Sequence, residues 1–100
     1  MYFITTVTYD RLHWDDGYRG DSRCVGFYHY FSDADDAVLS NMYDIHEGDY
    51  DYVVIEEIRG EGLYPGIDSS RWYQWDYDHD QYQPIERPVE AKYLTNFCLG

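Results

Sequence analysis

The sequence is poor in basic residues. Seven Lys and Arg stand against 20 Asp and Glu in 100 residues, which gives a formal net charge of −13 at pH 7. A chain this acidic repels phosphates, which excludes binding to DNA, RNA or an anionic membrane through a basic surface. The same charge attracts basic surfaces of other proteins. The acidic residues are interleaved with apolar ones, which indicates a folded chain rather than a charged tail.

Cysteine is scarce, and long apolar runs are missing. The two cysteines, Cys24 and Cys98, lie among strand-forming residues, where a cysteine usually behaves as a small buried hydrophobe. The opening segment MYFITTVTYD has neither the basic start nor the apolar run of a signal peptide. No stretch reaches the ~20 apolar residues of a membrane-spanning helix. We therefore expect a cytoplasmic protein with reduced thiols.

Aromatic residues are abundant, at 20% of the chain with 13 tyrosines. Tyrosine packs its ring and keeps its hydroxyl in water, which suits both half-buried strands and contact surfaces. Either use of the tyrosines fits the composition. The length corresponds to one domain, so we expect residues 1–100 to form a single acidic α+β domain.

Runs of β-branched and aromatic residues predict three strands, over residues 2–9, 23–31 and 52–58. In the second strand, strict alternation places Val25 and Phe27 on one face and Cys24 on the other. The third strand has an apolar centre, which is typical of a strand in the interior of a sheet.

Between the second and third strands, the apolar residues recur with the spacing of a helix. Ser32 is expected to cap this helix, because a serine hydroxyl can accept a hydrogen bond from a free N–H group of the first turn. Acidic residues follow in that turn, where the helix dipole favours negative charge. The expected apolar stripe consists of Ala34, Ala37, Val38, Met42 and Ile45.

The C-terminal third predicts a hairpin, with strands over residues 71–76 and 81–86. Pro84 cannot donate to a ladder, so its strand should be an edge strand or kinked. Pro88 is expected to open a short helix over 89–94, and residues 96–100 to form a short final strand. The predicted fold is a small antiparallel sheet with strand order 2-1-3, the C-terminal hairpin and one main covering helix.

Residues 72–88, WYQWDYDHDQYQPIERP, raise the question of a metal site. Their alternating aspartates have the one-three-five spacing of a calcium loop, but Gln81 replaces the glycine at position six and Arg87 the glutamate at position twelve. His79, or His46 with Glu47, could help to bind a divalent metal, but neither histidine has a second histidine at i+4, so the pattern is a weak sign of a metal site. We interpret the stretch as a solvated hairpin turn, and we expect no metal and no cofactor.

Signatures of catalysis are missing as well. The sequence contains no nucleophile elbow, phosphate-binding P-loop or dinucleotide fingerprint. Carboxylates are plentiful, but no pair is distinguished as a general acid and base. We therefore expect no catalytic residue and interpret the protein as non-enzymatic.

Several stretches carry a resemblance: SRCVGFYHYFSDADDAVLSNMYDIHE, YVVIEEI, EGLYP, RWYQW, YQPIERP and NFCLG. They resemble small uncharacterised proteins of low-GC Gram-positive gut bacteria, their phages and their mobile elements. The resemblance covers most of the chain but not RLHWDDGYRGD, and it transfers no activity or catalytic residue. The order strand–strand–helix–strand is common in short phage-encoded proteins, which implies an accessory or anti-defence role.

The charge and the aromatic residues together predict a protein that binds a basic, nucleic-acid-handling partner. Rigidly held carboxylates can imitate a nucleic-acid backbone and compete for a basic groove, as in DNA-mimic or anti-CRISPR inhibitors, with aromatic anchors beside them. The expected contact residues are Asp33, Asp35, Asp36, Glu47, Asp49, Asp51, Asp76, Asp78, Asp80, Trp72 and Trp75.

Three alternatives stay open. The acidity can serve solubility alone. The protein can be a regulatory or structural domain. It can also be a small-ligand binder, for instance an oligomeric sponge for a nucleotide, in which arginine holds phosphate and tryptophan stacks on the base. The residues of that last site would be Arg59, Arg71, Arg87, Trp72 and Trp75.

Overall fold

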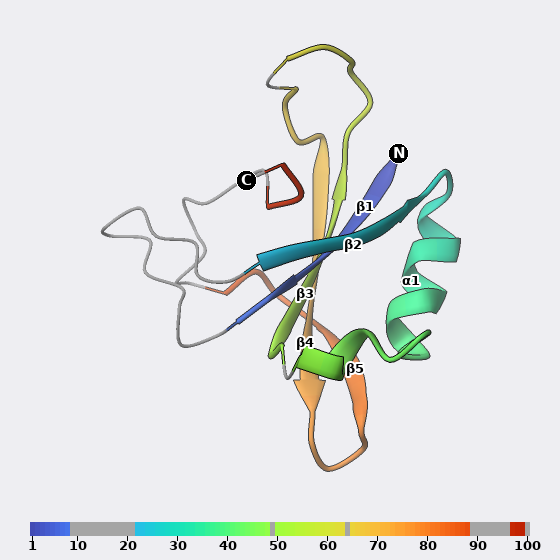
Figure 1. Ribbon diagram of the computed structural model, residues 1–100, viewed down its shortest axis with the longest axis vertical. Helices are drawn as coiled ribbons and strands as arrows, with labels where there is room; N and C mark the ends of the chain where they lie inside the picture. The colour runs from blue at the N-terminus through green and yellow to red at the C-terminus, as the bar shows by residue number, and fades with distance from the viewer. Residues whose placement is uncertain (9–21, 49, 64, 89–96, 100) are drawn as a thin grey trace.

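The computed structural model describes residues 1–8, 22–48, 50–63, 65–88 and 97–99. They form a five-stranded antiparallel sheet in the order β2-β1-β3-β4-β5, with one α-helix on one face (Figure 1). The predicted α+β fold with strand order 2-1-3 plus a C-terminal hairpin is confirmed, and the hairpin extends the sheet beside β3. The elements are β1 (Tyr2–Val7), β2 (Ser22–Tyr28), α1 (Phe31–Leu39), the 3₁₀ helix η3 (Ile45–Gly48), β3 (Tyr52–Glu57), β4 (Ser69–Asp76) and β5 (Gln81–Ile85).

The central strand β3 is buried along its whole length. It lies between β1 and β4, and both of its faces are covered, which explains its apolar sequence. Val53 and Ile55 belong to the core on the helix side, whereas Tyr52 and Val54 belong to a second cluster on the other side. No helix in the described residues is long and apolar enough to cross a membrane.

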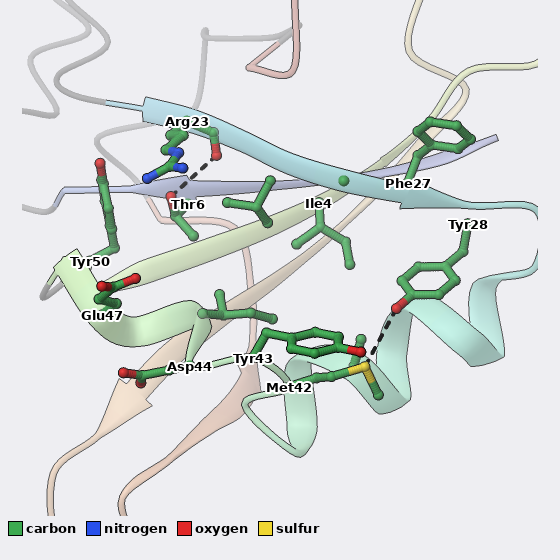
Figure 2. Close-up of a pocket in the computed structure, with 14 residues that line it drawn as sticks. Ile4, Thr6, Arg23, Phe27, Tyr28, Met42, Tyr43, Asp44, Glu47 and Tyr50 are labelled. Carbon is green, nitrogen blue, oxygen red and sulfur yellow. Dashed lines mark hydrogen bonds between the residues drawn. The ribbon is translucent and has the colours of Figure 1, made fainter.

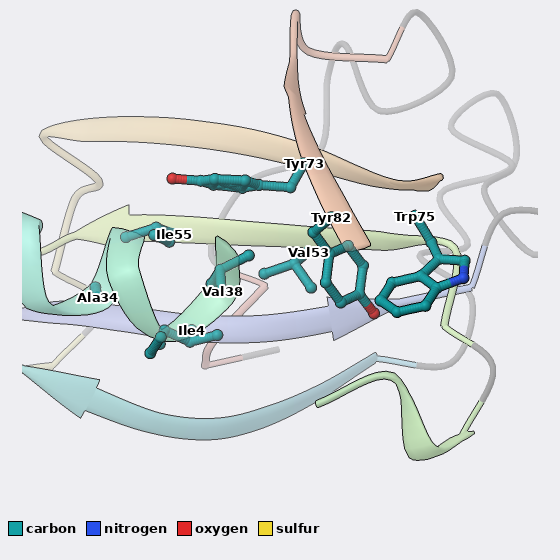
Figure 3. Packing of buried hydrophobic residues seen from close by; sticks show 9 residues of the cluster. Ile4, Ala34, Val38, Val53, Ile55, Tyr73, Trp75 and Tyr82 are labelled. Carbon is teal, nitrogen blue, oxygen red and sulfur yellow. The ribbon is translucent and has the colours of Figure 1, made fainter. Parts of the chain in front are cut away.

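The helix α1 packs its small residues on the sheet. Ala34 and Val38, both fully buried, lie in one cluster with Ile4, Val53 and Ile55 (Figure 3). The third strand and the helix therefore share one core, as expected for a helix that covers the sheet. Aromatic residues of the hairpin, including Tyr73 and Tyr82, complete the same core.

The ends of α1 differ from the prediction. The N-cap is Tyr30, without a side-chain hydrogen bond, so the prediction that Ser32 caps the helix is wrong. At the other end, Asn41 adopts a left-handed φ of 49°, and the Met42 N–H bonds the Ala37 carbonyl at 2.9 Å. This is a Schellman motif, and it places Met42 beyond the helix, 40% exposed. Met42 is therefore not part of a helical apolar stripe.

A β-bulge in β2 changes which side chains share a face. Ile4 pairs with Gly26 but Thr5 pairs with Cys24, so Val25 is an extra residue. The bulge puts Cys24 and Phe27 on the same face, away from α1, because it resets the alternation. The prediction that these two residues lie on opposite faces is wrong. Cys24 is exposed, contrary to the expectation that it is buried.

The sheet face opposite α1 holds the end of the chain. Glu56, 2% exposed, accepts hydrogen bonds from the backbone N–H groups of Phe97, at 3.1 Å, and Cys98, at 2.9 Å. Burial, with Glu56 nearby, raises the pKa of the Cys98 thiol to about 12. Residues 97–99 form a turn and not the predicted strand. The helix predicted over 89–94 lies outside the described residues.

Candidate functional site

The hairpin of β4 and β5 has the solvated turn that the sequence predicts. Asp78 and His79 are exposed. The Asp76 carboxylate closes the turn by accepting from the Asp78 N–H at 2.9 Å, and it pairs with the His79 ring at 2.6 Å. The contact with His79 lowers the pKa of Asp76. In the part of the chain that the structure describes, no three His, Cys, Asp or Glu side chains form a group that could hold a metal ion.

The η3 helix packs against this hairpin through aromatic rings. The His46 imidazole stacks on the Trp75 indole, with centroids 3.8 Å apart and 6° between the planes. The Tyr77 and Tyr82 rings meet the same imidazole edge-on. The backbone N–H of Trp75 donates a hydrogen bond of 2.8 Å to the backbone carbonyl of Asp51. These contacts hold η3 and Asp51 against the end of the hairpin that carries its turn, in the lower part of the molecule in Figure 1.

Two acidic clusters that are separate in sequence therefore lie at the same end of the sheet. We call this group the acidic end. Asp76 closes the hairpin turn and Asp51 is half-buried, whereas the other four side chains are exposed. Asp49, which was also predicted for the contact surface, lies outside the described residues. The acidic end consists of Asp44, Glu47, Asp51, Asp76, Asp78 and Asp80.

The third predicted cluster lies on α1 and is a separate patch. Asp33 stands in the first turn, at the end of α1 away from the acidic end (Figure 1). Asp33 and Asp36 are exposed. Asp35 is half-buried and accepts a hydrogen bond of 2.5 Å from the hydroxyl of Tyr73. Burial, together with Asp35, raises the pKa of Tyr73. Asp35 therefore fastens the helix to β4 and is not a free surface charge.

The two tryptophans expected as anchors are both buried, on opposite faces of the sheet. Trp72 is 2% exposed and packs against Tyr52 and Phe97, whereas Trp75 is 9% exposed and is covered by His46. The exposed aromatic side chains near the acidic end are Tyr77 and Tyr43, 64% and 95% exposed. Nothing in the local sequence distinguishes these two from the other tyrosines.

The structure does not gather the predicted arginines around one tryptophan. Arg59 makes a two-pronged pair with Glu57, at 2.8 and 3.2 Å, and Glu57 also accepts from Ser69 at 2.9 Å. With Arg59 as the main cause, the pKa of Glu57 falls to about 2. Arg71 lies over the Phe31 ring, 5.6 Å from its centroid.

Arg87 lies on the other face of the sheet. With Trp72 and Phe97 it lines a cavity of about 20 Å³. A ligand the size of a nucleotide needs a pocket of roughly 300 Å³ or more, so this cavity cannot hold one.

A larger groove lies between the β1–β2 edge of the sheet and a wall formed by residues 42–47 and Tyr50 (Figure 2). Its volume is about 660 Å³, within the usual range of ligand sites. Ile4 and Thr6 form its floor, and Tyr28 and Met42 close one end, where the Tyr28 hydroxyl lies 3.6 Å from the Met42 sulfur. Arg23, Glu47 and Tyr50 lie at the other end. The groove is thus apolar at one end and charged at the other.

Gly26 keeps this groove open. It pairs with Ile4 on the helix side of the sheet, and a Cβ added at this position would meet nothing within 4 Å. Sequence reasoning missed the groove, although a glycine inside a strand pattern is a known sign of a bulge or of a close approach. Gly26 lies next to the bulge, and its missing side chain leaves open space on the sheet face that the groove uses.

One wall of the groove has an unusual backbone. Asn41, Tyr43 and Asp44 have φ values of 49°, 53° and 56°. Asn and Asp tolerate the left-handed region, whereas for tyrosine this conformation is unfavourable by roughly 1–2 kcal/mol. The Asn41 side chain accepts from the His46 N–H at 3.0 Å and donates to the Asp44 carboxylate at 3.3 Å. The fold therefore holds Tyr43 in a strained and fully exposed position.

No protein-family model matches the chain, and no curated protein and no solved structure matches it. The described surface offers two neighbouring features, the acidic end and the groove. They share Asp44 and Glu47, which stand on the wall between them.

Proposed function

We propose that the protein is a non-enzymatic binding protein whose acidic end docks on a basic surface of a partner protein. One observation carries this proposal: carboxylates from two distant parts of the chain are held at the same end of the sheet. Glu47 is held next to the hairpin because its neighbour His46 stacks on Trp75. Asp78 and Asp80 stand in the hairpin turn itself.

The distribution of positive charge supports this orientation. Four arginines belong to the described residues, and none stands in the hairpin turn or in η3. Arg23, on β2, lines the groove at the end where Glu47 lies. Arg59 pairs with Glu57, Arg71 lies within β4 on the helix side, and Arg87 follows β5. The acidic end therefore presents negative charge to solvent, and such a surface steers a basic partner during diffusional encounter.

A nucleic-acid-handling protein is the partner class that this surface fits best. Such proteins carry basic grooves that accept rows of phosphates, and rigid carboxylates would compete for the same groove. The protein would then act as an inhibitor by occupying the groove. An anti-defence role, encoded on a phage or mobile element, is the specific form of the proposal that the sequence resemblance supports.

The test begins with affinity capture from bacterial lysate and continues with the purified partner. The charge-removing variant is Asp78→Asn with Asp80→Asn; asparagine suits the left-handed φ of 50° at Asp80. The matched control, Asp33→Asn with Asp36→Asn, removes two exposed charges from α1. We expect the first variant to weaken binding about tenfold and the control less than about threefold.

Competition distinguishes inhibition from simple binding. If the protein occupies the nucleic-acid groove, the partner's nucleic acid must displace it. Equal losses in the two variants, or a complex that binds nucleic acid unhindered, would contradict the proposal.

A further inference from the structure

On the basis of the proposed function, we infer that the groove between β2 and the wall of residues 42–47 takes an extended segment of the partner. The segment would place an apolar side chain at the end formed by Tyr28 and Met42. It would place lysine or arginine against the carboxylates of Asp44 and Glu47. The partner would thus be held by its basic surface at the acidic end and by one inserted segment in the groove.

The shape of the groove fits an extended peptide. The groove follows β2 from Arg23 to Tyr28, a distance of ~17 Å at ~3.4 Å per residue. Five or six residues of an extended chain would fill that length.

The apolar end offers surface that a partner can bury. Met42 and Val25 are 40% and 44% exposed, although both line the groove. Ile4 lies beneath them as part of the core. An apolar side chain seated here would remove surface from water on both itself and the groove, at about 25 cal/mol per Å².

The charged end selects a basic segment. Asp44 and Glu47 are both exposed, and both line the groove. They also belong to the acidic end. When a basic surface of the partner docks on the acidic end, the adjoining residues of the partner therefore lie at the mouth of the groove. Arg23, the basic side chain in the lining, faces the same end and can bind a carboxylate or a carbonyl oxygen of the segment.

Two features of the fold keep the groove available. Gly26 leaves the floor open, and the strained backbone presents the Tyr43 ring to solvent on the opposite wall. Strain in an exposed residue is typical of binding sites, where the surrounding structure maintains it.

The experiment uses a dye-labelled peptide of alternating lysine and leucine, about nine residues long, with both ends blocked. A second peptide has serine in place of leucine and the same charge. Binding to the full chain is measured by fluorescence anisotropy at about 0.1 M salt. We expect the wild type to bind the leucine peptide at least about tenfold more tightly than the serine peptide.

The decisive variant is Gly26→Phe, which fills the groove without changing the charge. Because the site is open and its φ is not left-handed, the substitution should leave circular dichroism and melting temperature close to wild type. It should remove the preference for leucine and keep the weak binding of the serine peptide. Gly60→Phe adds the same ring at an equally open position away from the groove, and it should keep the preference.

NMR titration of the wild type provides a measurement that does not depend on a variant. The leucine peptide should shift the amide signals of Gly26, Tyr28 and Met42. A wild type without preference, a Gly26→Phe variant that keeps it, or shifts confined to the hairpin turn would each overturn the inference.

The groove and the proposed function can fail separately. If Gly26→Phe binds the captured partner as the wild type does, while Asp78→Asn with Asp80→Asn binds weakly, the groove inference fails and the proposed function stands. If the charge variant binds the partner unimpaired, the proposed function fails, whatever the peptides show.

Discussion

The imidazole of His46 lies flat on the indole of Trp75, with 3.8 Å between the ring centroids. This stack joins η3 to the hairpin. It also fixes the wall of the groove, because the His46 backbone N–H donates to the Asn41 side chain at 3.0 Å. One pair of rings thus positions both surfaces that we assign to binding.

His46→Ala should therefore loosen both surfaces. An aromatic pair contributes about 0.5–1.5 kcal/mol beyond its buried area, so we expect the free energy of unfolding to fall by about 2 kcal/mol in urea titrations. His46→Phe should retain most of the stability because it keeps the stack. His29→Ala, at an exposed histidine, should change stability by less than about 0.5 kcal/mol. A similar small loss for His46→Ala would show that the stack does not hold the segment.

Tyr43→Gly should separate stability from binding. Glycine relieves a left-handed strain of roughly 1–2 kcal/mol and loses about 0.5–1 kcal/mol through the entropy of the unfolded chain. We expect a net change between about zero and a gain of about 1.5 kcal/mol, with weaker binding of the leucine peptide because the exposed ring is gone. Asn41→Gly should instead lower stability, since it removes the hydrogen bonds to His46 and Asp44. A clear loss of stability in Tyr43→Gly would contradict the claim that the backbone at Tyr43 is strained.

Val38 and Met42 test where the helix ends. Val38→Asp puts an unpaired charge at a fully buried position, which should cost several kcal/mol and unfold the domain. Met42→Asp, at a side chain 40% exposed, should leave the fold intact. Thermal melts followed by circular dichroism measure both. Equal damage would mean that Met42 belongs to the core, as its spacing in the sequence predicts.

The lowered pKa of Glu57 predicts that this residue contributes to the loss of stability in acid. Its pKa is about 2 in the folded chain, against an ordinary 4.5, so its contribution is complete above about pH 4.5. As the pH falls from about 4.5 to about 2, the unfolded chain takes up this proton first, and the contribution is lost.

Urea titrations of the wild type and of Glu57→Gln across this range measure that component. The variant should be less stable at pH 7, because it loses the ion pair with Arg59, and its stability should decline less steeply toward low pH. Glu61→Gln, at an exposed carboxylate, is the control. Parallel curves for wild type and Glu57→Gln would contradict the assignment.

The fold was predictable where the sequence pattern is local. Alternation and β-branched residues identify β1, β3 and the hairpin, and the apolar run of β3 places it inside the sheet. The bulge at Val25 was not predictable from alternation, because one extra residue reverses the faces on either side of it. Asn41 was a usable signal for the helix end, since asparagine often takes the left-handed position of a Schellman motif.

The candidate site was predictable only in part. Composition indicates an acidic surface, but it does not show that Asp35 is bound to Tyr73, or that Trp75 is covered by His46. These contacts join residues 38 and 29 positions apart, and no local pattern encodes them. The groove depends on Gly26 facing residues 42–47 across the groove, which only the assembled fold reveals.

The central claim is that exposed carboxylates of the acidic end bind a basic partner, and salt dependence tests it most directly. We would measure the affinity of the captured partner for the wild type and for Asp78→Asn with Asp80→Asn between ~0.1 M and ~1 M salt, where the Debye length shrinks from ~10 Å to ~3 Å. The wild type should lose at least about tenfold in affinity, and the two proteins should converge at high salt. An affinity indifferent to salt, or two curves that stay parallel, would contradict the claim.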